Sequence, residues 1–183
     1  MSNKLKPVLF IIVVVFQLAF LGLIIFQQEQ LKNNGALIRL KCEPVDPRSL
    51  ISGDYVILNY EISSFESEEV ENLIKGPNDF DRGKPVWVAL QKDADSDFWK
   101  VSAIANEREH LKREELVLRG RARGGWSSRL NVAYGLEQYF VPQYQGKDIE
   151  NNMASASVEV AVDDSGQSAV VRLFLEGEEV KFH

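Results

Sequence analysis

The stretch Gly53-Asp54-Tyr55-Val56-Ile57-Leu58-Asn59-Tyr60 decides how the fold of this chain is interpreted. It is reached through Asp46-Pro47, where proline fixes its own φ and pushes the preceding residue out of the helical region. Gly53 is able to take a positive φ, so the chain can turn before it extends. Residues 55–62 are β-branched and aromatic, and one face is wholly apolar: Val56, Leu58, Tyr60 and Ile62. The stretch predicts a strand that is entered through a specified turn.

Alternating apolar residues predict further antiparallel strands on both sides of this stretch. Residues 36–43 alternate and are expected beside the 55–62 strand, and residues 86–92 with 98–106 and 155–162 with 169–175 predict two hairpins. Short helices are expected at 63–75 and at about 147–153. The expected fold is therefore mainly β (α+β): an antiparallel β-sandwich or partly open barrel with one or two short helices.

The N-terminus carries an apolar run, Val8 to Phe26, that is interrupted only by Gln17 and Gly22. As a helix these nineteen residues extend roughly 28 Å, close to the ~30 Å hydrocarbon thickness of a bilayer. A cleaved signal peptide usually has an apolar core of about 7 to 15 residues and a small-x-small cleavage site. Because no such site follows Phe26, we interpret the run as an uncleaved signal anchor in contact with the lipid bilayer. A cleaved signal peptide and a buried core helix are the alternatives.

The charges that flank this run predict its orientation. Lys4 and Lys6 precede it, and the positive-inside bias then leaves the N-terminus in the cytoplasm. We expect residues 1–34 to form a cytoplasmic tip, transmembrane anchor and stalk, and residues 35–183 to form an extracytoplasmic β-rich domain. The predicted location is the bacterial inner (plasma) membrane, with the domain periplasmic or extracellular.

Composition excludes several classes of function. Without Lys4 and Lys6 the chain has 19 basic and 27 acidic residues, a net charge of about −8, which is unfavourable for binding nucleic acid or anionic lipid. The single cysteine, Cys42, excludes an intramolecular disulfide and is expected to be buried. Two isolated histidines and the lack of a phosphate-binding glycine loop predict no metal site, no cofactor and no catalytic group.

One local basic feature opposes this acidity. The predicted strand 116–123 carries Arg119, Arg121 and Arg123 on one face, and Arg129 follows shortly after. One interpretation is a solvent-facing sheet edge that is kept soluble by charge. The other is a docking surface for an anionic or carboxylate-bearing partner, since guanidinium groups bind carboxylates bidentately.

The pattern G-D-Y-x-x-L-x-Y is matched at five positions: Gly53, Asp54, Tyr55, Leu58 and Tyr60. With the block Tyr-Gly-Leu-Glu-Gln-Tyr-Phe-Val-Pro at 134–142, the chain resembles the GDYXXLXY family of bacterial membrane-anchored proteins. It departs from that pattern at 143–145, where Gln-Tyr-Gln replaces a tighter Glu-Gly turn. The resemblance implies no assigned activity. It also implies a multi-span membrane protein as partner, because family members tend to be encoded near one.

Two further questions stay open at this stage. Aromatic residues of the second block, Tyr134, Tyr139, Phe140 and nearby Tyr144, suit a partner surface and a hydrophobic core equally well.

The other question is catalysis. Residues 47–56 superficially resemble a segment of bacterial signal peptidases, but the position of their serine nucleophile is occupied by Pro44, so Ser49 or Ser52 would have to replace it. The favoured function is an extracytoplasmic interaction domain that serves a membrane-protein partner in envelope assembly or homeostasis. A membrane-anchored serine hydrolase is the alternative.

Overall fold

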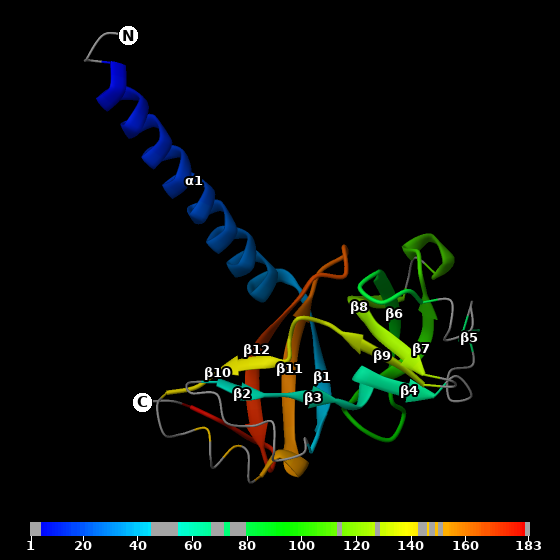
Figure 1. Cartoon of the computed structure of the whole chain (residues 1–183). Coiled ribbons are helices and arrows are strands. Elements are labelled where there is room, and N and C mark those ends of the chain that lie inside the picture. The colour runs from blue at the N-terminus through cyan, green and yellow to red at the C-terminus, as the bar shows by residue number, and fades with distance from the viewer. Residues whose placement is uncertain are drawn as a thin grey trace.

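The structure is a computed structural model that describes residues 5–44, 55–66, 72–73, 80–112, 115–126, 129–142, 146, 149 and 152–181. These residues form one long helix, thirteen strands and three short 3-10 segments. Figure 1 shows the helix α1 (Leu5–Asn34) projecting away from a body made of strands. The mainly β fold with one preceding helix is confirmed.

Helix α1 is long and apolar enough to cross a membrane, judged by its length and composition. None of the residues in its most apolar stretch is buried against the rest of the protein, and Phe10 and Phe16 are 69% and 71% exposed. The alternative of a buried core helix is therefore wrong.

The helix meets the β-body at a closely packed junction. Leu31 is buried, and its carbonyl accepts a 2.9 Å hydrogen bond from the N–H of Gly35. A Cβ on Gly35 would lie 2.7 Å from the Leu31 carbonyl oxygen and 2.9 Å from the Val162 nitrogen. This position needs glycine for close approach, and only Gly fits there without displacement.

A five-stranded sheet forms one side of the body, in the order β13-β12-β11-β1-β3. Its strands are β1 (Ala36–Glu43), β3 (Asn59–Tyr60), β11 (Ala156–Val162), β12 (Ser168–Leu175) and β13 (Glu178–Glu179). Strand β1 pairs antiparallel with β11 and, at Cys42 and Glu43, with β3. The predicted hairpin near the C-terminus and the predicted neighbours of residues 36–43 are confirmed. Burial raises the pKa of the Cys42 thiol to about 12.

A six-stranded sheet forms the other side, in the order β4-β9-β8-β6-β7-β5. Its strands are β4 (Ser64–Glu66), β5 (Asn72–Leu73), β6 (Pro85–Lys92), β7 (Trp99–Ala105), β8 (Leu116–Trp126) and β9 (Arg129–Ala133). The β6–β7 hairpin is as predicted, and β5 pairs parallel to β7 whereas the other pairs are antiparallel.

Two expectations about this sheet are wrong. A helix was expected at 63–75, yet β4 pairs with β9 and β5 pairs with β7, because pairing with distant strands overrides local helix signals. Of the two interpretations of the arginine-bearing strand, the sheet edge is wrong, because β8 lies inside the sheet between β9 and β6. Residues 67–71 and 74–75 lie outside the described residues. Most of the second expected helix, at about 147–153, also lies outside the described residues. Within it Ile149 is helical, and the 3-10 segment η5 (Met153–Ser155) follows.

The β6–β7 turn attaches the six-stranded sheet to β1. Phe98 forms an isolated parallel bridge with Arg39, whose guanidinium lies 4.3 Å from the centre of the Phe174 ring and 5.9 Å from that of Phe98. Stacking on two aromatic faces holds this cation between the two sheets.

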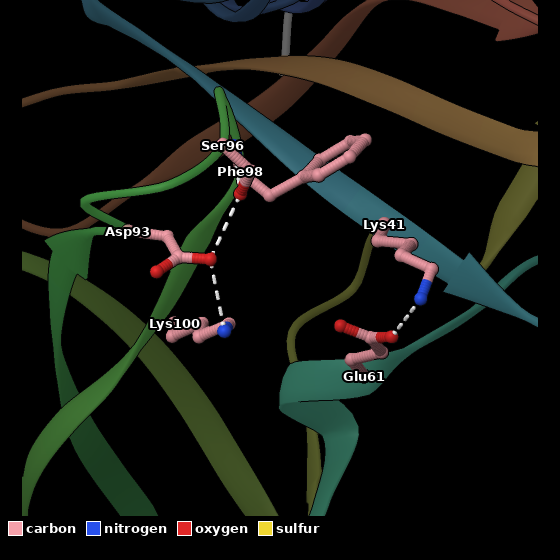
Figure 2. A network of polar contacts seen from close by, with 6 residues as sticks. All are labelled: Lys41, Glu61, Asp93, Ser96, Phe98 and Lys100. Atoms are coloured by element: carbon pink, nitrogen blue, oxygen red, sulfur yellow. Dashed lines mark hydrogen bonds and ion pairs between the residues drawn. The ribbon is translucent and has the colours of Figure 1, made fainter.

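Figure 2 shows the polar contacts around this attachment. Lys41 of β1 forms an ion pair with Glu61 of the 3-10 segment η2 (Glu61–Ser63). In the turn, the Asp93 carboxylate accepts a hydrogen bond from the Ser96 hydroxyl and lies 2.9 Å from the Lys100 ammonium. The hydrogen bond from Lys100, followed by that from Ser96, lowers the pKa of Asp93.

Residues 55–62 and residues 134–140 bind each other across the core. Strand β2 (Tyr55–Ile57) pairs antiparallel with β10 (Gln138–Phe140), and the Leu58 N–H donates to the Glu137 carbonyl at 2.8 Å. The Tyr60 hydroxyl donates to the Leu136 carbonyl and the Tyr134 hydroxyl donates to the Ile62 carbonyl, each at 2.6 Å. We call these two hydrogen bonds the tyrosine clasp. Both tyrosines are buried, and burial raises both pKa values.

The predicted apolar face of the 55–62 stretch is confirmed, although the strand is interrupted at Leu58 and ends in η2. One cluster of buried side chains joins this face to both sheets, and its largest fully buried members include Tyr60, Ile38, Leu40, Leu58, Ile104 and Leu118. Both sheets contribute to this core, as expected for a sandwich or partly open barrel. A smaller second cluster contains Ala89, Ala103, Ala105, Leu111 and Val117.

Removing either clasp hydroxyl should destabilise the protein. We expect Tyr60→Phe and Tyr134→Phe each to lower the free energy of unfolding by about 1–2 kcal/mol, because a buried carbonyl loses its donor. Tyr55→Phe is the matched control, since Tyr55 is half-buried and its hydroxyl has no partner among the described residues. Urea unfolding of the intact protein measures the effect, and losses no larger than that of Tyr55→Phe would contradict the role of the clasp.

The Asp93 turn should make stability depend on pH. A folded-state pKa below the unfolded value of about 3.9 stabilises the protein above that pH, and the contribution disappears as pH falls through the folded-state pKa. We expect Asp93→Asn to be less stable than the unmodified protein at pH 7, with the difference shrinking below about pH 4. Unfolding free energies measured from pH 7 to pH 2.5 would test this, and a difference constant with pH would contradict it.

Candidate functional site

Strand β8 presents three arginines on the outer face of the six-stranded sheet. Arg119, Arg121 and Arg123 are exposed, whereas the alternate residues Leu118, Gly120 and Ala122 are buried. This is the alternation that the sequence predicted. A Cβ on Gly120 would lie 2.3 Å from Cγ1 of Val132, so the inward face is packed tightly behind the arginines.

The three guanidinium groups differ in their partners. Arg119 lies over Trp87, with 5.5 Å between Cζ and the ring centre. Neither Arg119 nor Arg121 forms an ion pair with any described residue, whereas Arg123 Nη2 lies 3.9 Å from Glu137 Oε2. Stacking of Arg119 on a ring leaves its N–H groups available at the edge. Two cations on this face are therefore available to an external anion.

A cavity of about 310 Å³ lies beside these two cations. We call it the arginine pocket, and it is lined by Pro85, Arg119, Gly120, Arg121, Ala133, Tyr134, Gly135 and Glu137. The pocket thus brings the arginine-bearing strand together with the start of the 134–142 block. The sequence indicated both segments separately and did not predict that they meet.

Glu137 also lines this pocket. Its Oε1 accepts a 2.6 Å hydrogen bond from the Tyr134 N–H, and its Oε2 accepts a 3.0 Å hydrogen bond from the Gly135 N–H. Gly135 adopts a φ of 81°, which favours glycine. The carboxylate is held by its own turn, with the side chain 15% exposed. Two arginines and this one carboxylate line the pocket, and the carboxylate is paired with Arg123 outside the pocket lining.

A second cavity of about 250 Å³ lies on the other side of Glu137. We call it the polar pocket, and it is lined by Asn59, Ser63, Ser64, Arg123, Asn131, Val132 and Glu137. Ser63 is only 7% exposed, and its hydroxyl has no hydrogen-bond partner in the described part of the chain. A buried hydroxyl without a partner costs free energy, and this one has almost no accessible surface from which an external ligand could satisfy it.

The other predicted site residues divide between core and surface. Leu58, Tyr60 and Tyr134 are buried in the core, whereas Tyr139 is half-buried. Phe140 is 74% exposed and packs edge-on against Tyr55, with ring centres 6.2 Å apart. Three predicted residues, Gly53, Asp54 and Tyr144, lie outside the described residues.

Sequence reasoning missed most of the residues between the two pockets. Glu137 was seen only as part of the second block, although its position three residues after Tyr134 allows a carboxylate to turn back onto two N–H groups. Nothing in the local sequence singled out Ser63, Ser64 or Asn131, because they become neighbours only through the pairing of β4 with β9.

The described residues contain no group of three His, Cys, Asp or Glu side chains that could hold a metal ion. His110 is exposed on the 3-10 segment η4 (Arg108–His110), with Nε2 3.8 Å from Glu107. Ser49 and Ser52, which the hydrolase alternative requires, lie outside the described residues.

Fold and site together define a mainly β domain that follows a helix of membrane-spanning length and carries a basic pocket on one sheet face. Residues 17–173 match the family model described as GDYXXLXY protein, so the chain belongs to this family. The matched region includes every residue of both pockets. No curated protein and no solved structure matches the chain.

Glu137 should be needed for the geometry of both pockets. In Glu137→Gln, one of the two backbone N–H groups faces an amide NH₂ instead of an acceptor, which we expect to lower the free energy of unfolding by about 1–3 kcal/mol. Glu109→Gln, at an exposed position on η4, makes the same chemical change as a control. Guanidinium unfolding compares the two variants. Equal effects would show that the turn does not depend on the carboxylate.

Proposed function

We propose that this protein is a single-pass, membrane-anchored interaction domain whose arginine pocket binds a carboxylate-bearing partner outside the cytoplasm. The observation that carries the proposal is the pair of exposed guanidinium groups, Arg119 and Arg121, that lack ion pairs with described residues and line a cavity. Charge-assisted hydrogen bonds from arginine to a carboxylate are among the strongest polar contacts in proteins.

The membrane anchor supports the location of the domain. Helix α1 is long and apolar enough to span, and Lys4 and Lys6 precede its apolar run. Under the positive-inside rule this arrangement leaves the β-body in the periplasm or outside the cell. The glycine junction at Gly35 packs the end of the helix against β11, so the domain is held close to the bilayer.

The same anchor favours a partner in the same membrane, and we propose a multi-span membrane protein that acts in envelope assembly or homeostasis. Two proteins confined to one bilayer meet at a high effective concentration, so a site with few contacts is sufficient. The size of the pocket, about 310 Å³, lies at the lower end of ligand sites and suits one side chain of a partner.

Reversing the charge of the pocket should prevent partner binding. We expect Arg119→Glu/Arg121→Glu to reduce the partner recovered after chemical crosslinking in the native membrane by at least about tenfold, because two charge-assisted contacts are lost. Lys112→Glu/Lys181→Glu changes the net charge equally at exposed positions away from the pocket. Equal recovery with the two double variants would contradict the proposed function, provided that both melt like the unmodified protein.

A further inference from the structure

We propose that the arginine pocket and the polar pocket bind one extended polypeptide segment of the partner. An acidic side chain of that segment occupies the arginine pocket, and the adjoining backbone lies against the polar pocket. This inference rests on the proposed function and specifies the ligand of the same site.

The sheet register places the two pockets side by side. In the arginine pocket, Arg121 of β8 is paired with Ala133 of β9. Asn131 lies two positions earlier on β9, and in the polar pocket it is paired with Ser64 of β4. Two residues of a strand extend about 7 Å. Since Glu137 borders both cavities, an extended segment of roughly three to five residues is long enough to reach from one pocket to the other.

The polar pocket has the chemistry of a backbone-binding site. Besides the Arg123–Glu137 ion pair, its walls carry neutral groups that donate and accept. The side chains of Ser64 and Asn131 form no hydrogen bond with the described part of the chain. Each residue of a polypeptide offers one N–H donor and one carbonyl acceptor. Ser64 and Asn131 are half-buried in the lining of this pocket and can pair with such groups.

Glu137 disfavours a second negative charge at the boundary of the two pockets, although Arg123 lies 3.9 Å from its Oε2. Its carboxylate lies between the pockets, so a polyphosphate or a polyanionic glycan that crossed both would meet a like charge at the centre. Its two oxygens each accept one N–H from the local turn and each keep a second lone pair. A polypeptide crossing at this point can donate an N–H there, which a polyanion cannot do.

Both the proposed partner and the pocket favour an acidic side chain in the bound segment. External loops of membrane proteins are poor in Lys and Arg, so acidic residues there are not neutralised by neighbouring bases. The arginine pocket is of a size for one such side chain, with Arg119 already oriented by Trp87.

Site-specific photo-crosslinking in the intact protein tests the inference. A benzoylphenylalanine replaces Pro85 at the arginine pocket in one variant and Ser64 at the polar pocket in another, and crosslinked peptides from the native membrane are sequenced by mass spectrometry. We expect both positions to capture one segment of one protein, at attachment points within about five residues of each other, with an Asp or Glu in that segment. Capture of unrelated segments, or of a lipid or glycan, would overturn the inference.

Two variants separate this inference from the proposed function. Asn131→Ala should reduce capture at position 64 by about fivefold, while Arg119→Glu/Arg121→Glu should remove capture at both positions. If only the arginine variant has an effect, the carboxylate site stands and the extended-segment inference fails. If neither variant reduces capture, the proposed function fails as well. Thermal unfolding of each variant verifies that it is folded.

Discussion

The tyrosine clasp is the interaction on which the rest of the structure depends. Tyr60 and Tyr134 each donate to the main chain of the other's segment, so two stretches more than seventy residues apart are tied reciprocally inside the core. A buried hydroxyl that has a carbonyl partner specifies one register, because any slip leaves both groups unpaired. The same two hydrogen bonds fix the turn that carries Glu137, and therefore the wall that separates the two pockets.

The sheets need such specific ties because no disulfide links them. Cys42 is the single cysteine of the chain, and it is buried. Contacts made by turns connect the sheets instead. The Arg119 N–H of β8 donates to the Gly166 carbonyl at 2.9 Å. Arg39 of β1 stacks on Phe98 and Phe174. The hydrogen bond to Gly166 occupies β8 at Arg119, before the residue Arg121 at which pairing with β9 begins. The arginines consequently stand on a strand that is hydrogen-bonded on both sides, which holds their spacing.

The features that could be predicted from the sequence are those that depend on residues close together along the chain. Alternation identified the inward face of residues 55–62, the two hairpins and the outward arginines of β8, because a period of two is a local property of a strand. Position within a sheet is not local. The sequence around Ser64 has acidic helix signals, yet it pairs with Asn131, and β8 lies inside a sheet that its charges suggested it would border. The pockets were missed for the same reason, since their residues come from four separate segments.

The charge of the whole domain and the charge of its pocket act over different distances. A domain with a net charge of about −8 does not attract an acidic partner from afar, and salt screens charges beyond about 8 Å. Arg119 and Arg121 can therefore select a carboxylate only after the partner has arrived by other means. Under the proposed function, confinement to one membrane would supply that encounter, because it replaces long-range electrostatic attraction with proximity. An acidic body also repels free anions that would otherwise compete, so in the proposed function the anchor and the acidity together would make a small basic pocket selective for a partner in the same bilayer.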